Sequence, residues 1–409
     1  MKNILSIITL LSIIALASCS KKTIPNTNEQ GEAKQTPIEI AVAVSNSTTD
    51  FAFDFFKTLQ TDPQATENVF VSPLSLHMAL GMLANGATGE TQTQILSAIK
   101  AGNLSIAELN ASYKKLMTEL PKADPKVKLA LANSVWNKSG FIVEADYITT
   151  LNNYFEAQSK VLSTVEAINQ WASDNTNGKI TKVLQQLDPD LVLILMNALY
   201  FKGDWVTQFK TADTKNESFT LENGSSKTVS MMNQASKFKY ASMDDFEAVE
   251  LPYGNKQFVA TIILPKPGKT LNAVFNNLNS TKWTSLQGGL DSATIILKLP
   301  KFKLEQDFQL NEVLKGMGMQ KAFTDAAELQ GIHKTAPLSV SFVKQNTFAA
   351  VDEVGTEAAA VTTIGIVFTS VGPITNIPFY CNRPFGIIIS EKTSNTILFM
   401  GKIMNPDSH

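Results

Sequence analysis

The sequence predicts a mixed α+β fold in which helices pack around β-sheets. Apolar residues recur at helical spacing in the first part of the chain, for example from Phe51 to Leu59, whereas apolar runs with β character recur between residues 191 and 403. After residue 45 no linker rich in proline, glycine or serine and no run of charge divides the chain. We therefore expect one large domain over residues 46–409.

The individual elements follow from local signals. Ser72 followed by Pro73 is a strong helix start, because serine caps a helix and proline fits its first position. The run from Leu191 to Phe201 is almost continuously apolar, as expected of a strand covered on both faces. Helices are expected at 51–59, 73–86, 147–155, 168–180 and 312–319, strands at 127–137, 191–201, 294–302, 385–390 and 396–403, and a hairpin of 249–252 with 258–265 around Gly254-Asn255.

The N-terminus has the features of a processed leader. Lys2 is followed by an apolar run that is too short to span a bilayer, and we expect residues 1–18 to be a signal peptide. The sequence Leu16-Ala17-Ser18-Cys19 resembles the lipobox of bacterial lipoproteins, which implies lipidation of Cys19 and a protein anchored in the cell envelope, at the outer membrane. Plain secretion with a chance cysteine is the alternative. Residues 19–45 are expected to form a flexible, lipid-anchored tether.

Composition excludes several functional classes. The formal net charge is −2 and no basic stripe with interleaved aromatics is present, so nucleic acid is not an expected partner. The chain has 2 cysteines, which cannot build a zinc cluster. With Cys19 lipidated, Cys381 has no intramolecular disulfide partner. A hydrophobic content of 44% suffices for a large core.

The search for catalytic constellations gives no defensible enzyme site. His77, His333 and His409 are the imidazoles of the chain, and His77 lies in an apolar helix where a hydrogen-bonded core histidine is expected. Neither G-x-S-x-G nor H-E-x-x-H occurs. We therefore expect no catalytic residues, no metal and no cofactor, and a hydrolase is a weak runner-up.

The segment from Val351 to Val371 stands out because it passes from acids through Gly355 and alanines into an uncharged, β-prone run. As a strand it would place alternate side chains on one face. These are Thr356, Ala358, Ala360, Thr362, Ile364, Ile366 and Phe368. An ordinary strand with a glycine at its start is one interpretation of this pattern.

A family resemblance favours another interpretation. GTEAAA at Gly355–Ala360 resembles the hinge of the serpins, the serine-protease-inhibitor superfamily, and NRPFGIIIS from Asn382 and ILFMGKIMNP from Ile397 resemble the serpin C-terminal signature. The resemblance implies the serpin fold, with helices around three β-sheets and an exposed reactive-centre loop at about residues 354–378. It also implies a mechanism: a protease cuts the loop while acylated to it, and the hinge side inserts into the main sheet and traps the protease.

The resemblance also implies roles for individual positions. Ser72, Ser75 and Asn197 match the polar cluster under the sheet opening, Trp205 matches the tryptophan where the hinge enters, and Lys301 and Glu353 match an ion pair at that entrance. Gln345 stands where the family usually has a histidine, and its amide can replace imidazole bonding because it both donates and accepts. The hinge comprises Glu353, Gly355, Thr356, Glu357, Ala358, Ala359 and Ala360.

Thr356 favours an inhibitory serpin over a non-inhibitory binding protein, which remains the alternative. A charged residue here would be buried on insertion at a cost of several kcal/mol, and threonine has no such barrier.

The bait bond is expected at Phe368-Thr369, with Thr369-Ser370 as second choice, because Phe368 is the only large side chain between Thr356 and Pro373. Val367 and Thr369 also suit elastase-like or subtilisin-like pockets. No lysine or arginine lies near, so chymotrypsin-like rather than trypsin-like proteases are expected, bound 1:1 and covalently by a monomer. The expected targets are host proteases.

Overall fold

Strands of two β-sheets form the frame of the computed structural model, which describes residues 35–65, 67–335, 337–356 and 376–406. The predicted strands between 127 and 403 are all present, and further strands complete the sheets. Their bounds are β1 Val69–Val71, β2 Val127–Lys138, β3 Gln158–Leu162, β4 Leu193–Asp204, β5 Lys215–Thr220, β6 Ser226–Ser242, β7 Phe246–Pro252, β8 Phe258–Pro265, β9 Asp291–Pro300, β10 Phe302–Gln309, β11 Lys344–Val351, β12 Gly355–Thr356, β13 Ile377–Tyr380, β14 Phe385–Glu391 and β15 Thr396–Ile403.

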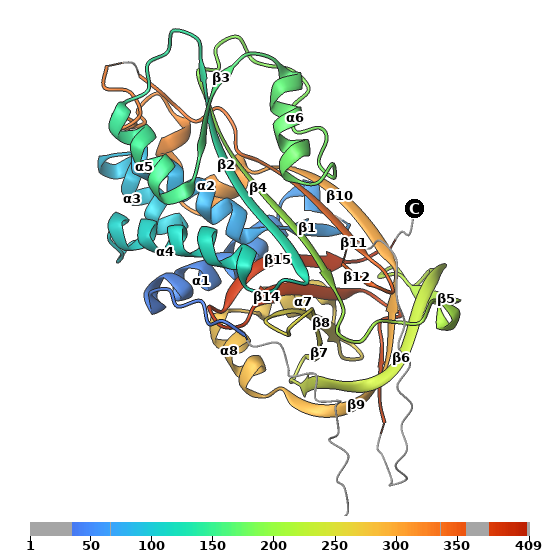
Figure 1. The fold of residues 1–409 in the computed structure, drawn as a ribbon. Helices are drawn as coiled ribbons and strands as arrows, with labels where there is room; N and C mark the ends of the chain where they lie inside the picture. Colours follow the sequence, from blue (N-terminus) through green and yellow to red (C-terminus); the bar gives the residue numbers. More distant parts are fainter. Residues whose placement is uncertain (1–34, 66, 336, 357–375, 407–409) are drawn as a thin grey trace, which may run out of the picture. The chain divides into compact units, whose positions relative to one another are not determined.

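One sheet has the strand order β10-β11-β12-β4-β2-β3. Figure 1 shows its long strands β2 and β4 side by side, and they pair antiparallel from Val127 opposite Gly203 to Asn137 opposite Leu193. The run that forms β4 was expected to be buried on both faces. The residues from Ala198 to Phe201 are buried, but Leu193, Leu195 and Met196 are only partly buried. The reason is that the edge of β4 that faces away from β2 borders an opening described below.

The other sheet has the order β1-β15-β14-β8-β7-β6-β9-β13, with β5 paired to β6. Its central connector is β6, 17 residues long, which pairs with β5 at one end, β9 in the middle and β7 at the other end. The three sheets that the family resemblance implied are therefore two hydrogen-bonded networks among the described residues, because β6 is continuous through two of them.

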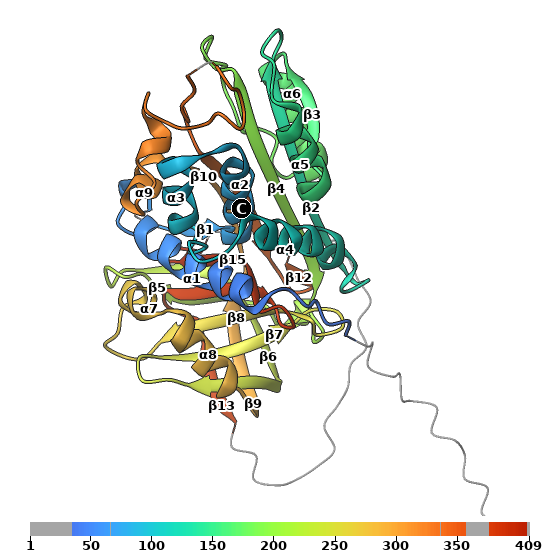
Figure 2. The same cartoon turned by 90° about the vertical axis from the view of Figure 1, so that its left-hand side faces the viewer.

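Helices pack against both sheets, and Figure 2 shows the long strands β2 and β4 beside α4 and α2. Helix α2 contacts β4 of the first sheet and β15 of the second, and α6 contacts β2 and β4. As predicted, Ser72 caps α2 by accepting a hydrogen bond from the Ser75 N–H, with Pro73 at the first turn. The α-helices are α1 Val42–Leu59, α2 Pro73–Gly86, α3 Gly89–Ala98, α4 Ile106–Glu119, α5 Ala145–Phe155, α6 Val165–Asn175, α7 Leu271–Asn277, α8 Ser280–Gly288 and α9 Asn311–Gly316.

The predicted strand 294–302 is two strands in different sheets. β9 ends at Pro300, the Lys301 N–H bonds to the Ser230 carbonyl, and Phe302 begins β10 in the other sheet. Proline lacks the N–H that a continuing ladder needs, so the chain leaves one sheet at this position. The sequence pattern does not reveal the change of sheet because only Lys301 separates the two strands and no loop marks the break.

The predicted domain boundary at residue 46 lies inside α1, which begins at Val42. Gln35, Thr36 and Ile38 already bond to the domain, so the expected tether of residues 19–45 is too long at its C-terminal end. The leader and Cys19 lie outside the described residues. Within the part of the chain that the structure describes, no helix has the length and apolar character needed to cross a bilayer.

Candidate functional site

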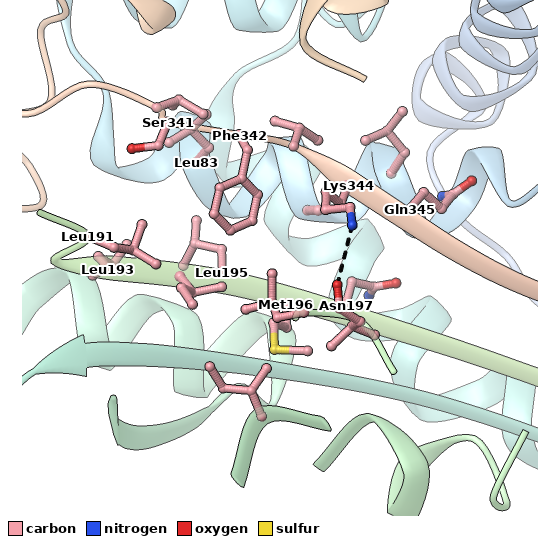
Figure 3. Close-up of a pocket in the computed structure, with 18 of the residues that line it drawn as sticks. Leu83, Leu191, Leu193, Leu195, Met196, Asn197, Ser341, Phe342, Lys344 and Gln345 are labelled. Atoms are coloured by element: carbon pink, nitrogen blue, oxygen red, sulfur yellow. Dashed lines mark hydrogen bonds between the residues drawn. The ribbon is translucent and has the colours of Figure 1, made fainter. Parts of the chain in front are cut away.

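The six-stranded sheet has an opening between β4 and β11. Among the described residues only β12, two residues long, lies between these strands, at the end where Val351 is opposite Thr356 and Thr356 is opposite Gly203. Beyond β12 a cavity of about 560 Å³ separates them. Figure 3 shows Leu195, Met196 and Asn197 on one side of this cavity and Phe342, Lys344 and Gln345 on the other.

Two helical segments cover the cavity from opposite faces of the sheet. Helix α2 supplies one wall with Ser75, Leu80 and Leu83. The other wall comes from α6 and the chain that follows it, through residues that pack as a second apolar cluster with β4. They include Ile168, Trp171, Ala172, Val183 and Leu184. A strand placed between β4 and β11 would thus be buried on both faces.

The polar residues predicted under the opening do lie there. Gln345 on β11 forms a reciprocal pair with the backbone of Ser72: its Nε2 donates to the Ser72 carbonyl at 2.8 Å, and its Oε1 accepts from the Ser72 N–H at 2.9 Å. The Ser72 hydroxyl donates to the Leu398 carbonyl at 2.8 Å. Gln345 thus both donates and accepts, which is the bonding we expected of an amide in the place of an imidazole.

Asn197 on β4 faces the same cavity. Its Nδ2 donates to the Asn133 Oδ1 at 2.6 Å, and Asn133 donates in turn to the Phe155 carbonyl at 2.7 Å. The Asn197 Oδ1 is buried and has no partner among the described atoms. An unpaired buried carbonyl oxygen costs free energy, and a donor arriving in the opening would recover it.

The hinge enters the sheet at Gly355 and Thr356. A Cβ at Gly355 would lie 2.1 Å from the Gly203 carbonyl oxygen, so no larger residue fits this crossing without moving the backbone. Thr356 is 4% exposed, and its hydroxyl lies 2.6 Å from the Tyr253 hydroxyl. The two hinge residues are therefore already part of the sheet.

Trp205 holds the turn that precedes the hinge. Its indole N–H donates to the Asp352 carbonyl at 3.0 Å, and its backbone N–H donates to the Val354 carbonyl at 2.8 Å. The Asp352 carboxylate accepts from the N–H groups of Val354 and Gly355. The predicted position of Trp205 beside the entrance of the hinge is what the structure shows.

Glu353 anchors the same turn through a partly buried ion pair. The Lys301 Nζ lies 2.7 Å from its carboxylate, and the Thr214 hydroxyl donates to it at 2.8 Å. Burial alone would raise the pKa of this carboxyl, but the hydrogen bonds from Lys301, its own backbone N–H and Thr214 outweigh burial and hold the pKa below its usual value. The carboxylate therefore stays charged at neutral pH.

His77 is a core histidine. It is 0% exposed, its Nδ1 lies 2.7 Å from the Tyr113 hydroxyl, and its Nε2 lies 3.0 Å from the Ile99 carbonyl. The carbonyl can only accept, so Nε2 carries the proton and Nδ1 accepts from Tyr113. Among the described residues no group of acidic, histidine and cysteine side chains could hold a metal ion.

Several predicted site residues lie outside the described residues, and the geometry says nothing about them. They are Cys19, Glu357, Ala358, Ala359, Ala360, Val367, Phe368, Thr369 and Ser370.

Sequence reasoning missed Tyr253 and Asn133. Tyr253 follows Pro252 at the β7–β8 turn, and nothing in that local pattern indicates a contact with Thr356. Asn133 could have been found, because an amide within the strand 127–137 at a buried position requires partners.

Residues 46–406 match the family model "Serpin (serine protease inhibitor)". The chain belongs to the serpin family. Among curated serpins it is 34% identical over 374 residues to Ipis-1 of Ixodes persulcatus, covering 88% of this chain and 98% of that protein. It is 32% identical over 392 residues to human Serpin B4, covering 89% of this chain and 100% of that protein.

Solved serpin structures share the fold. The thermophilic serpin Tengpin in its native state matches with a TM-score of 0.83 and 31% identity, covering 91% of this chain and 96% of Tengpin. Human thyroxine-binding globulin matches with a TM-score of 0.81 and 25% identity, covering 90% of this chain and 100% of that protein. The predicted serpin fold is confirmed, but a relative that is named for binding thyroxine means that the fold alone does not select protease inhibition.

Proposed function

We propose that this serpin is a suicide-substrate inhibitor of endopeptidases and has no catalytic activity of its own. After a protease cuts the bait loop, the hinge side inserts between β4 and β11 and holds the protease as a covalent acyl complex. The observation that carries the proposal is the pairing of Gly355 and Thr356 between these strands, at the end of a cavity that can take a longer strand. The uncut chain would be metastable, because a kinetic barrier would keep its loop from inserting.

The register of β12 supports insertion of the whole hinge segment. Thr356 is opposite Gly203 on β4 and Val351 on β11. Continuing antiparallel by six residues brings Thr362 opposite both Asn197 and Gln345, where its hydroxyl could donate to the unpaired Asn197 Oδ1. Continuing to the first residue of β4 brings Ile366 opposite Leu193. A bait bond after Phe368 would leave a segment long enough to cover the free edge of β4.

The composition of the segment fits the two faces of the opening. In this register the even-numbered residues from Thr356 share the face of Asn197 and Leu195 toward α2, and none of those up to Phe368 is charged. Glu357, on the other face, would be opposite Lys202, which is itself opposite Lys128. The only charge in the inserting segment thus meets two lysines.

The bait loop selects the proteases. Phe368 suits an apolar chymotrypsin-like pocket, and Val367 and Thr369 suit elastase-like or subtilisin-like pockets. We infer targets of host origin, bound 1:1 by a serpin monomer, with no cofactor and no nucleic acid. The alternative is a non-inhibitory serpin that acts as a binding protein, as thyroxine-binding globulin does for the ligand in its name.

The location of the serpin follows from its leader. The lipobox-like sequence ending at Cys19 supports a lipoprotein of the bacterial cell envelope, anchored at the outer membrane. In this combination of leader and domain the chain resembles the bacterial lipoprotein serpin miropin. Targets would then be captured close to the cell surface.

Mixing the mature serpin with chymotrypsin and with a neutrophil elastase tests the inhibitory mechanism. A denaturing gel should show a covalent complex larger than either partner. If only cleaved serpin and active protease appear, trapping does not occur and the binding-protein alternative is favoured.

A further inference from the structure

The four residues 35–38, which we call the terminal clasp, bond to parts of the domain far away in sequence. The Gln35 Nε2 donates to the Asn255 carbonyl at 3.3 Å. The Thr36 N–H donates to the Gln257 Oε1 at 3.2 Å, and the Gln257 Nε2 donates to the Thr36 carbonyl at 2.8 Å. The Ile38 N–H donates to the Thr393 hydroxyl at 2.9 Å, and Ile38 is 1% exposed. The clasp is thus built into the domain.

Gln257 is the centre of these contacts. It is 0% exposed, and its Nε2 also donates to the Glu391 carboxylate at 3.0 Å. Its Oε1 accepts a hydrogen bond from the Thr36 N–H. Without the clasp, a fully buried amide oxygen would lose that hydrogen bond, which is costly in a water-poor environment.

The turn that Gln257 ends also contacts the hinge. Residues 253–257 connect β7 and β8, and the Gln257 N–H bonds to the Asn255 Oδ1 within this turn. At the other end of the turn, the Tyr253 ring stacks on Trp205 with 4.5 Å between ring centroids, and its hydroxyl meets Thr356. A continuous set of contacts, partly buried at Thr36 and buried from Gln257 onward, therefore joins Thr36 to Thr356.

The Asp204 carbonyl ties this turn to the sheet as well. It accepts from the Gly254 N–H at 3.1 Å, and Asp204 is opposite Gly355 in the ladder between β4 and β12. A shift of the turn would thus reach the hinge both through a side chain and through the backbone.

We propose that the terminal clasp and Gln257 are positioning elements that hold the 253–257 turn and, through Tyr253 and Asp204, fix the hinge in the sheet. The inference rests on the proposed inhibitory function, because it makes the start of loop insertion sensitive to the chain just after the tether. A cut within residues 35–38, or a pull that breaks their hydrogen bonds, would loosen the hinge.

A matched pair of variants at one exposed position tests the coupling. Thr36→Pro removes the N–H that donates to Gln257, whereas Thr36→Ala keeps it and changes only an exposed side chain. Hydrogen exchange followed by mass spectrometry should show peptides covering 253–257 and 352–356 exchanging about five-fold faster in Thr36→Pro, as expected for loss of one net hydrogen bond. Thr36→Ala should match the parent chain.

A second variant tests the route. Tyr253→Phe removes the hydroxyl that meets Thr356 and should accelerate exchange at 352–356 but not at 257. Combined with Thr36→Pro, it should give less than the product of the two single effects, because both substitutions affect the contact between Tyr253 and Thr356, and the route through the Asp204 carbonyl remains. Faster exchange of the turn without any change at 352–356 in Thr36→Pro would overturn the coupling, and so would no change in either segment.

Inhibition is measured on the same proteins. The yield of covalent complex should fall in Thr36→Pro and not in Thr36→Ala. If the parent chain itself forms no complex, the proposed function fails, while the exchange data still decide whether the clasp positions the hinge.

Discussion

At the scale of single residues, Thr356 decides whether the hinge can enter the sheet. It is buried beside Tyr253 and Gly203, where a neutral hydroxyl finds a partner and a charge would not. Thr356→Arg should therefore turn the serpin into a substrate. Burying an unpaired guanidinium at a cost of ~3 kcal/mol would slow insertion about 100-fold. Gel analysis with chymotrypsin should show cleavage without complex.

Thr356→Ser is the control for this substitution, because it keeps the hydroxyl and should keep trapping. An undiminished complex yield in Thr356→Arg would mean that this residue does not have to be buried during inhibition.

His77 makes stability dependent on pH. Burial lowers the pKa of the His77 imidazole from its ordinary 6.5 to about 4, although the hydrogen bond to the Ile99 carbonyl opposes the shift. The unfolded chain thus binds a proton at a higher pH than the folded chain. The contribution of neutral His77 to the free energy of unfolding is complete above pH 6.5. It is lost as the pH falls toward 4, by about 3 kcal/mol in total.

Urea unfolding between pH 7 and pH 4 measures this loss. His77→Gln should be less stable at pH 7 and should show a shallower decline over the same interval. A decline as steep in His77→Gln as in the parent chain would assign the acid sensitivity to other groups.

At the scale of elements, β4 presents charge to the segment that we expect to insert. Lys202 lies on β4, opposite Lys128 on β2, and the β12 register brings Glu357 opposite Lys202. A favourable cross-strand pair contributes up to about 1 kcal/mol. Lys202→Glu should therefore slow insertion about two- to five-fold, measured as a higher number of serpin molecules consumed per protease inhibited.

The charge swap distinguishes pairing from a general effect of Lys202. Adding Glu357→Lys to Lys202→Glu should restore most of the lost efficiency. Failure of the swap to restore it, with both single variants folded, would contradict the extrapolated register.

The bait segment gives a second prediction at this scale. Phe368→Arg should weaken inhibition of chymotrypsin-like proteases and create inhibition of trypsin-like ones, because the trypsin pocket carries a carboxylate. Loss of the apolar anchor should cost ~2 kcal/mol of binding. An elastase-like enzyme should be less affected, since Val367 and Thr369 remain.

Mass spectrometry of the released C-terminal fragment identifies the peptide bond that the protease cleaves. Cleavage after Phe368 leaves a fragment that starts at Thr369. A fragment that starts beyond Gly372 would place the bait on the far side of the loop and remove Phe368 from its role.

At the scale of the whole molecule, the predicted anchor and the inhibitory domain should be separable. Cys19→Ala should release the protein from the membrane fraction, because two or more acyl chains hold a lipoprotein stably and the variant has none. Inhibition in solution should be unchanged, since the terminal clasp begins at Gln35, well after the anchor. Fractionation measures membrane association, and the gel assay measures complex formation. A parent chain that is already soluble in the medium after leader removal would contradict lipidation of Cys19.

How far the sequence predicts this molecule depends on the range of the contact. Local signals placed α2 to the residue, because the Ser72 cap and Pro73 act within one turn. The apolar runs located the strands but not their sheet, so the change from β9 to β10 at Lys301 was missed.

The site shows the same dependence. Gln345 and Trp205 were found through motif resemblance, and the ion pair of Lys301 with Glu353 is present. Tyr253 was not, because its contact with Thr356 spans 103 positions and leaves no trace in either local pattern. Position within a motif can be read from sequence, whereas a partner brought in by the fold cannot.

The tight crossing at Gly355 has a consequence for how such a protein could diversify. The backbone contact with Gly203 and the buried Thr356 lie upstream of every residue that a protease would read. Close packing of the backbone constrains the first of these regions, whereas the pocket of the target protease would constrain the residue before the cleaved bond. Substitutions near the bait bond could therefore change which protease is bound, while Gly203, Gly355 and Thr356 stay the same.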